Sequence, residues 1–359
     1  MIETHELIAR HKKVLALISE RKFETALGLI NECIEISRKT ALNYFLKGRI
    51  YDKMLDYPAS IKAYEKCMAR DPNNQKAKFY LSLSYLALEK FEPGCRYYTF
   101  RHEPEILRKF SALKPWSAKV KPGKVLLWSE QGIGDEVMFL RFLPFLETHS
   151  HCFTLQCDQR LIPILELNYP WLSFTPRGSA LNLTQFDYHL PIGDLLGLFH
   201  KRFRDVSHQF LDVRSNQKVK SLVENYKGLS LIGLSWLSMN EEYGQRRSWP
   251  VEALLEGLDP HNIAVVALQY LAPKSEIDKI RARGFQVIDD IDCHQDIDAV
   301  FSIMSHCEKI ITIDNSIAHF AGALGLETDI WLPNLPNWRW GLEKTKTYWY
   351  PSVTLKRFD

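Results

Sequence analysis

A glycine-bearing turn near residue 132 combines residue types that suit proton transfer. The apolar residues 125–128 predict a buried strand, Gly132 and Gly134 follow it, and Asp135 begins a predicted amphipathic helix. A strand that runs through glycines into a helix is a frequent ligand site in α/β proteins, because the first amide groups of the helix have no partner within it. Asp135 is therefore a candidate general base. The simpler alternative is an acid that only caps the helix, and both roles can coexist.

The sequence of this turn argues against the binding of a dinucleotide. It contains Gly-x-Gly but lacks the third glycine of the dinucleotide pattern, since Val137 stands three residues after Gly134. Asp135 and Glu136 would also repel a phosphate group. A nicotinamide oxidoreductase is therefore a weak hypothesis for this chain.

A second strand–turn–helix motif starts where an apolar strand ends at Asp314. Asn315 or Ser316 can cap the next helix, and Gly325 predicts its end. The free backbone amides at this helix N-terminus, together with Ser316 and the helix dipole, would hold a diphosphate. His319 lies one turn further on and would add a hydrogen bond, although a half-buried structural histidine is the simpler interpretation of this residue alone.

A third group of candidates surrounds a polar loop. Arg246 and Arg247 follow a predicted strand that ends at Ser235 and Trp236. Guanidinium groups bind phosphate oxygens bidentately, so both arginines are candidate phosphate ligands, with solvated loop charges as the alternative. Gln269 ends another predicted strand and could face the same cleft and contact a nucleoside.

The elements that must position these motifs are strands that alternate with helices. The predicted strands are 124–129, 152–157, 172–176, 187–191, 229–235, 263–269, 285–288, 309–313 and 328–332. Apolar strands that alternate with helical stretches predict parallel sheets with helices on both faces. A polar, basic segment, 201–220, separates two such units, and two units in tandem leave a cleft between them.

The region before residue 108 repeats with a period of about 34 residues. The matching columns are Val14, Gly48 and Ser82; Leu17, Tyr51 and Tyr85; Ala26, Ser60 and Gly94; and Ile30, Tyr64 and Tyr98. Small residues in one column and bulky residues in another let paired helices approach closely and stack on the next pair. This region resembles an array of about three tetratricopeptide repeats. Such an array offers a recognition surface for a protein or peptide, or serves only as a stabilising cap.

Composition argues against a nucleic-acid partner and against a disulfide-stabilised protein. Lys plus Arg is 46 and Asp plus Glu is 43, so the net charge of +3 gives little support for a nucleic-acid partner. No signal peptide and no transmembrane segment are expected. The seven cysteines show no Cys-x-x-Cys spacing, which disfavours a disulfide framework or a zinc site and favours a reducing, cytoplasmic location.

With the motifs in this order, residues 124–359 resemble the heptosyltransferase-like glycosyltransferases of family nine, in the form fused behind tetratricopeptide repeats in bacteria. The segments that carry the resemblance are Gln131–Glu136, Gly233–Trp236, Asp314–Gly325 and Asn337–Trp340. The resemblance implies an α + α/β chain, in which a helical repeat array is followed by a GT-B pair of Rossmann-type halves. We expect repeats over 1–112, a linker over 113–123, an acceptor half over 124–212 and a donor half over 229–359.

The resemblance also implies roles for the candidate residues. Asp135 would be the catalytic base of an inverting transfer that needs no metal and no cofactor. The nucleotide-sugar donor would contact Gly134, Trp236, Arg246, Arg247, Gln269, Asp314, Asn315, Ser316 and His319. The acceptor would be a protein, such as flagellin or another surface protein, or a cell-envelope glycan, with the repeats selecting it.

Two departures from the family pattern keep a second hypothesis open. Leu237 stands where repeat-fused members often carry an arginine, and the acceptor half is short. The alternative is a non-catalytic scaffold, in which the repeats bind a protein partner and the transferase domain is degenerate.

Overall fold

A computed structural model describes residues 2–239, 244–342 and 345–357 of the chain. It divides into two compact units. One unit holds the chain up to Lys109 together with the segment that begins at Leu335. The other runs from Phe110 to Asn334 and includes the last strand of the chain.

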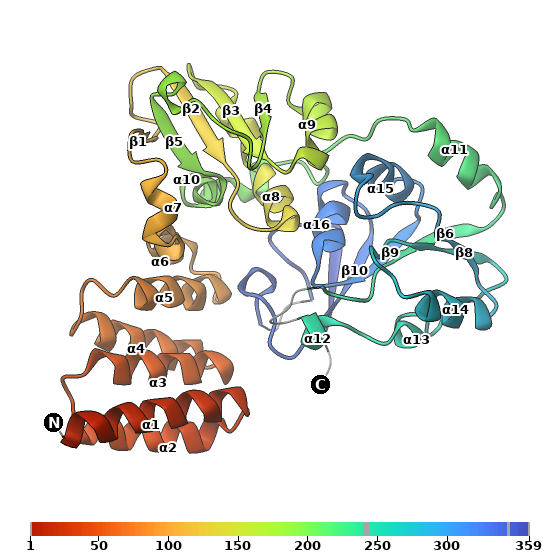
Figure 1. Cartoon of the computed structure of the whole chain (residues 1–359). Coiled ribbons are helices and arrows are strands. Elements are labelled where there is room, and N and C mark those ends of the chain that lie inside the picture. The colour runs from red at the N-terminus through yellow and green to blue at the C-terminus, as the bar shows by residue number, and fades with distance from the viewer. Residues whose placement is uncertain (1, 240–243, 343–344, 358–359) are drawn as a thin grey trace. The chain divides into compact units, whose positions relative to one another are not determined.

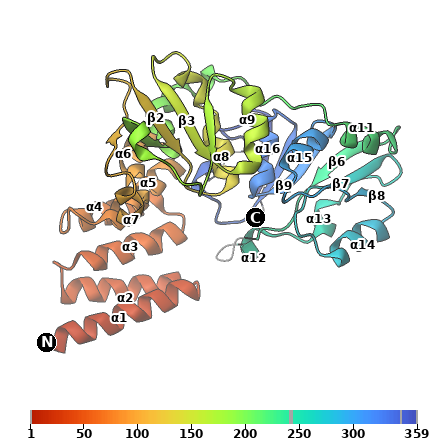
Figure 2. The same cartoon turned by 45° about the horizontal axis from the view of Figure 1, so that its top comes forward.

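The first unit is built from three pairs of antiparallel helices (Figures 1 and 2). The helices are α1 (Ile2–Ser19), α2 (Phe23–Ile36), α3 (Ala41–Lys53), α4 (Tyr57–Met68), α5 (Gln75–Ala87) and α6 (Phe91–Tyr98). A short helix, α7 (Pro104–Arg108), follows them. The predicted repeat array is therefore confirmed.

The repeat period has a direct structural cause. At Gly48 of α3 a Cβ atom would lie 2.5 Å from the ring of Tyr64 in α4, so only glycine lets these two helices approach this closely. The turn inside each pair contains one left-handed residue, Arg21, Leu55 or Glu89, with φ of 60°, 62° and 58°. Each of these three lies one period from the next. The repeat in sequence is thus a repeat in backbone geometry.

The second unit begins with a five-stranded sheet in the order β1-β5-β2-β3-β4. Its strands are β1 (Lys114–Pro115), β2 (Lys124–Trp128), β3 (Cys152–Cys157), β4 (Ser173–Pro176) and β5 (Tyr188–Pro191), and all pair in parallel. The four longer strands match the predicted segments. The two-residue strand β1 lies in the segment that we expected to be a linker, and its pairing with β5 extends the sheet.

A six-stranded parallel sheet in the order β11-β10-β9-β6-β7-β8 follows. Its strands are β6 (Ser230–Leu234), β7 (Ile263–Ala267), β8 (Gln286–Ile288), β9 (Lys309–Ile313), β10 (Thr328–Leu332) and β11 (Val353–Arg357). The sequence analysis did not predict β11, because Lys356 and Arg357 obscure its apolar pattern. An edge strand tolerates such charges, since one of its sides is unpaired.

Helices connect the strands of both sheets. They are α8 (Ile133–Leu140), α9 (Ile162–Asn168), α10 (Leu195–Phe199), α11 (Gln217–Glu224), α12 (Gly244–Arg247), α13 (Val251–Leu254), α14 (Lys274–Ala282), α15 (Ile297–Met304) and α16 (Ser316–Ala323). Figure 2 shows α13 and α14 on one face of the six-stranded sheet and α15 and α16 on the other. The expected fold class, helical repeats followed by two Rossmann-type parallel sheets, is confirmed. Among the described residues, no helix is both long and apolar enough to cross a membrane.

Candidate active site

Both predicted turns lie where the strand order of a sheet reverses. In the first sheet the chain leaves β2 for β3 on one side and returns to β5 on the other, and α8 follows β2. In the second sheet β6 and β9 are neighbours in the same relation, and α16 follows β9. Ligands of open α/β sheets bind at such switch points, outside the carboxyl ends of the strands. The topology therefore places one candidate site in each sheet.

The N-terminal turns of α8 and α16 meet. A Cβ atom built on Gly134 in α8 would lie 3.1 Å from Cα of Ser316 and 3.0 Å from Cδ2 of His319. Gly134 is therefore a point of close approach between the two motifs, which lie far apart in the chain. Their two sites form one region within the second unit.

Asp135 lies in the first turn of α8 and is half-buried. Gly132 is the N-cap residue, and no side chain caps this helix. The next residue, Glu136, is almost fully buried, so Asp135 is the first-turn acid that retains access to solvent. This placement fits a base that receives a proton from a substrate hydroxyl group.

The N-terminus of α16 is held by a polar network across the switch point. Oδ1 of Asn315 accepts a hydrogen bond from the amide of Ile317 at 3.0 Å, and its Nδ2 donates to Oγ of Ser235 at 2.8 Å. Ser235 follows β6 and Asn315 follows β9, so the cap ties two neighbouring strand ends together. Ser316 is the first residue of the helix and is partly exposed.

Arg247 is anchored to the same turn. Its Nε lies 3.3 Å from Oδ2 of Asp314, whose side chain is 1% exposed, while that of Arg247 is 22% exposed. A buried carboxylate thus holds the guanidinium group beside α16. A carboxylate paired in this way orients the arginine, and the expected contact of Asp314 with the donor stays a prediction. Arg246 is exposed.

Gln269 and Trp236 support the loop that carries these residues. Oε1 of Gln269 accepts three hydrogen bonds, from Oγ of Ser235 at 3.1 Å and from the amides of Trp236 and Leu237 at 3.1 and 2.8 Å. The Trp236 side chain is fully buried in the core beside Val251 and Val265. Both residues support the site from beneath through these contacts, and their expected contact with the donor stays a prediction.

His319 is buried one turn into α16. Its Nδ1 lies 2.8 Å from the hydroxyl oxygen of Tyr350, near the C-terminus. The Tyr350 ring rests on Gly322, where a Cβ atom would approach it to 2.2 Å. Tyr350 thus fixes both the ring of His319 and the back of α16, and the sequence analysis did not identify this role.

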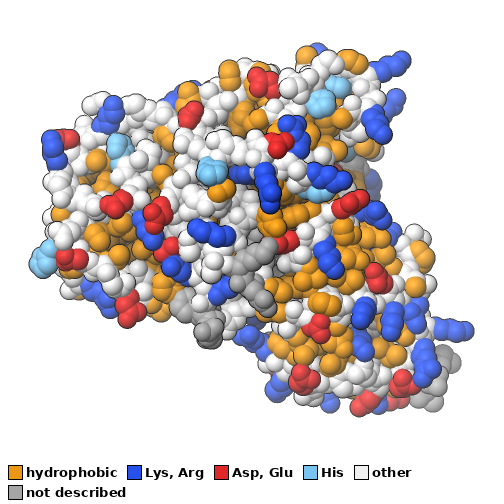
Figure 3. Space-filling model, turned by 180° about the vertical axis from the view of Figure 1, so that it is seen from behind, with side chains coloured by type: hydrophobic (Ala, Val, Ile, Leu, Met, Phe, Trp, Pro, Cys, Tyr) orange, Lys and Arg blue, Asp and Glu red, His pale blue; other side chains and the backbone are white. Residues whose placement is uncertain are grey.

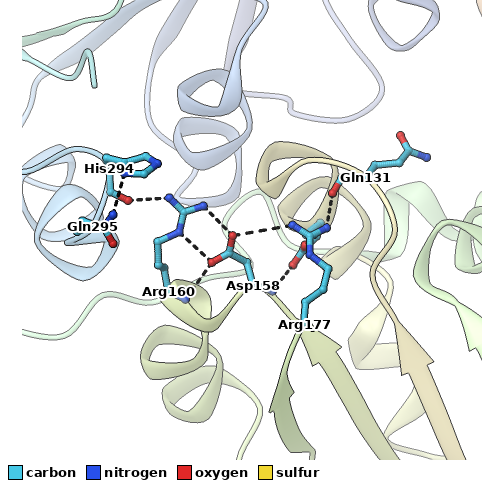
Figure 4. Close-up of polar contacts among 7 residues, drawn as sticks. Gln131, Asp158, Arg160, Arg177, His294 and Gln295 are labelled. Carbon is cyan, nitrogen blue, oxygen red and sulfur yellow. Dashed lines mark hydrogen bonds and ion pairs between the residues drawn. The ribbon is translucent and has the colours of Figure 1, made fainter. Parts of the chain in front are cut away.

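A cluster of four charged residues joins the first turn of α8 to the ends of β3 and β4, and it was not predicted from the sequence (Figure 4). It contains Glu136, Asp158, Arg160 and Arg177. Nη1 of Arg177 lies 3.0 Å from Oε1 of Glu136, and Nη2 of Arg160 lies 2.6 Å from Oδ2 of Asp158. Burial raises the pKa of Glu136, while hydrogen bonds from Arg160 lower the pKa of Asp158. Of these four residues only Glu136 was noted from the sequence, because the two arginines come from other loops.

The site has a polar and charged composition. Among the described residues, no group of three or more His, Cys, Asp or Glu side chains could hold a metal ion. The arrangement places a solvent-accessible carboxylate on one helix N-terminus beside a second N-terminus that is equipped with Arg247. It can take a proton from a hydroxyl group at one point and hold an anion at the other.

No family model matches the chain. Protein FlbA of Caulobacter vibrioides is 28% identical over 302 residues, which cover 75% of this chain. The matched region is 49% of that relative, so the chain spans about half the length of the curated protein it matches.

Two of the solved structures that are similar to this chain match different parts of it. A family 9 glycosyl transferase from Veillonella parvula is 12% identical, with a TM-score of 0.47 over 67% of this chain and 88% of its own. The type III secretion chaperone SycD of Yersinia enterocolitica, solved with a peptide of the translocator YopD, is 12% identical, with a TM-score of 0.27 over 30% of this chain and 86% of its own.

Proposed function

We propose that this protein is an inverting, metal-independent glycosyltransferase that moves a sugar from a nucleoside-diphosphate sugar to a hydroxyl group of a protein or cell-envelope glycan. The observation that carries the proposal is the meeting of two helix N-termini at Gly134. One of them presents the acid Asp135, and the other presents Ser316 beside Arg247 of α12, which Asp314 anchors. A base and an anion site side by side are what a sugar transfer from a diphosphate requires.

In this mechanism Asp135 accepts the proton of the acceptor hydroxyl. The acceptor oxygen forms a bond to the anomeric carbon, and the bond from that carbon to the diphosphate oxygen breaks. The nucleoside diphosphate leaves with the bonding electrons. Arg247, the free amides of α16 and the Ser316 hydroxyl stabilise the charge that grows on the leaving oxygen.

The repeats would select the acceptor. Ile8 of α1 and Leu42 of α3 are 47% and 43% exposed and lie one repeat period apart, so they occupy equivalent positions in successive repeats. Leu15 of α1 is 53% exposed. Figure 3 shows hydrophobic side chains intermixed with both basic and acidic side chains over the repeat helices. Such a surface suits a peptide with apolar and charged residues.

The first test is a calorimetric and thermal-shift screen of the full chain against ADP, UDP, GDP and CMP and their sugars. We expect micromolar binding of one nucleotide, and its loss in Arg247→Ala and in Ser316→Ala. Arg281→Ala is the matched control, because Arg281 pairs with Asp289 at 2.9 Å outside the site. Absence of binding to every nucleotide would favour the non-catalytic scaffold, whose partner would then be sought with peptides.

A further inference from the structure

The turn that carries Asp135 is clamped by an arginine from another loop. Nη1 of Arg177 donates to the carbonyl oxygen of Gln131 at 2.5 Å, and the same nitrogen lies 3.0 Å from Oε1 of Glu136. Gln131 precedes the turn and Glu136 ends it, so Asp135 lies between the two anchored points. One side chain thus bridges both ends of the loop.

The clamp is itself fixed to the sheet. The other carboxylate oxygen of Glu136 accepts a hydrogen bond from the amide of Asp158 at 2.8 Å, directly after β3. The amide of Arg177, directly after β4, donates to the carbonyl of Cys157 at 2.6 Å. The Glu136 side chain is 1% exposed. The first turn of α8 is therefore tied to the ends of β3 and β4 through the buried carboxylate of Glu136.

The charges of the cluster balance. Two acids, Glu136 and Asp158, face two arginines, Arg160 and Arg177, whose other contacts include backbone carbonyls. Nη1 of Arg160 also donates to the carbonyl of His294, which follows β8 in the second sheet, at 2.6 Å (Figure 4). No net positive charge is left to hold a substrate anion, so the arrangement favours a positioning role over a binding role.

We propose that Arg177 is a positioning residue that holds the Asp135 turn in its active orientation through Glu136 and the Gln131 carbonyl. The predicted effect of Arg177 on turnover depends on the proposed glycosyltransferase function. Its predicted effect on the amide exchange of the Asp135 turn does not. A displacement of about 1 Å in a reacting group is enough to lower a rate by roughly 100-fold.

The experiment uses the full chain in four forms: wild type, Arg177→Met, Arg177→Met with Glu136→Gln, and the control Arg281→Met. Hydrogen–deuterium exchange is measured over residues 132–137, and turnover and donor affinity are measured alongside. In Arg177→Met we expect at least 10-fold faster exchange of these amides and a kcat at least 10-fold lower, with the donor dissociation constant within about 3-fold of wild type. The double variant leaves no unpaired buried charge, so it should recover part of both losses.

Unchanged exchange over residues 132–137 in Arg177→Met would overturn the proposal, whatever the turnover. Faster exchange spread equally over both sheets would also overturn it, since it would reveal a general loss of stability. If wild type transfers no sugar from any donor, the proposed function fails, and the exchange over residues 132–137 still decides whether Arg177 positions the turn.

Discussion

The N-termini of α8 and α16 both lie where the strand order of a parallel sheet reverses, yet they differ in charge. The first turn of α8 holds two acids, Asp135 and Glu136, and no side chain caps it. The first turn of α16 holds no acid and is capped by the neutral Asn315. An acid at a helix N-terminus occupies the position that an anion would take, whereas a neutral cap leaves several amides available. Under the proposed function, the same local fold would serve a proton acceptor in one sheet and an anion site in the other.

The largest effect that this contrast predicts is at Asp135. Asp135→Asn keeps a polar group on α8 but removes the base, so turnover should fall by at least about 100-fold, the usual contribution of general base catalysis. Nucleotide affinity should stay within about 3-fold of wild type, because the proposed donor site is at α16. Steady-state kinetics and calorimetry on the same preparation measure both. Turnover that survives would place the base elsewhere.

The next effect concerns the anion side. Arg247→Lys keeps a positive charge for the buried Asp314 but loses the planar fork that binds a phosphate in two places. We expect the donor dissociation constant to rise about 10-fold, in line with the worth of one charge-assisted hydrogen bond. Thermal unfolding serves as a control and should change little. Equal affinity in the variant and in wild type would contradict the assignment of Arg247.

A smaller effect tests the contact between the two helices. In Gly134→Ala the new Cβ would meet Cα of Ser316 at 3.1 Å, so α16 must shift by a few tenths of an ångström. We expect a loss of about 1 kcal/mol in the free energy of unfolding. Gly132→Ala is the control, because its nearest neighbour, Oδ2 of Asp135, would lie 3.8 Å away. Similar stability of the two variants in urea denaturation would argue against a tight contact at Gly134.

The smallest effect is a pH dependence on the α8 side. Burial raises the pKa of Glu136, so the folded state holds a proton that the unfolded state releases. Its contribution to stability is present below the ordinary glutamate pKa of about 4.3 and is lost as pH rises toward the raised value. Glu136→Gln should therefore flatten the decline of the unfolding free energy as pH rises above about 4.3. If the unfolding free energies of the variant and of wild type change in parallel with pH, the pH dependence does not come from Glu136.

Much of the fold could be predicted because its signals are local. The repeat columns follow from the packing of Gly48 against Tyr64, and the predicted strands are short apolar segments that stop at turn residues. The turns that hold Asp135 and Ser316 are equally local, since a glycine or a cap and the first helical turn lie within a few residues. The charged strand β11 and the two-residue strand β1 were missed, because only pairing with a neighbour makes them strands.

The sequence by itself determined the repeat, the alternation of strands and helices, and the two turns, one with acids and one with a neutral cap. Tertiary structure decided which side chains meet: Gln269 receives three hydrogen bonds beneath the site, Trp236 is buried in the core, and Arg177 clamps a turn 46 residues away. The physical reason is the range of the interactions. Turns and periodicities reflect contacts between near neighbours, whereas the order of strands in a sheet brings together polar groups whose separation in the chain gives no sign of their partner.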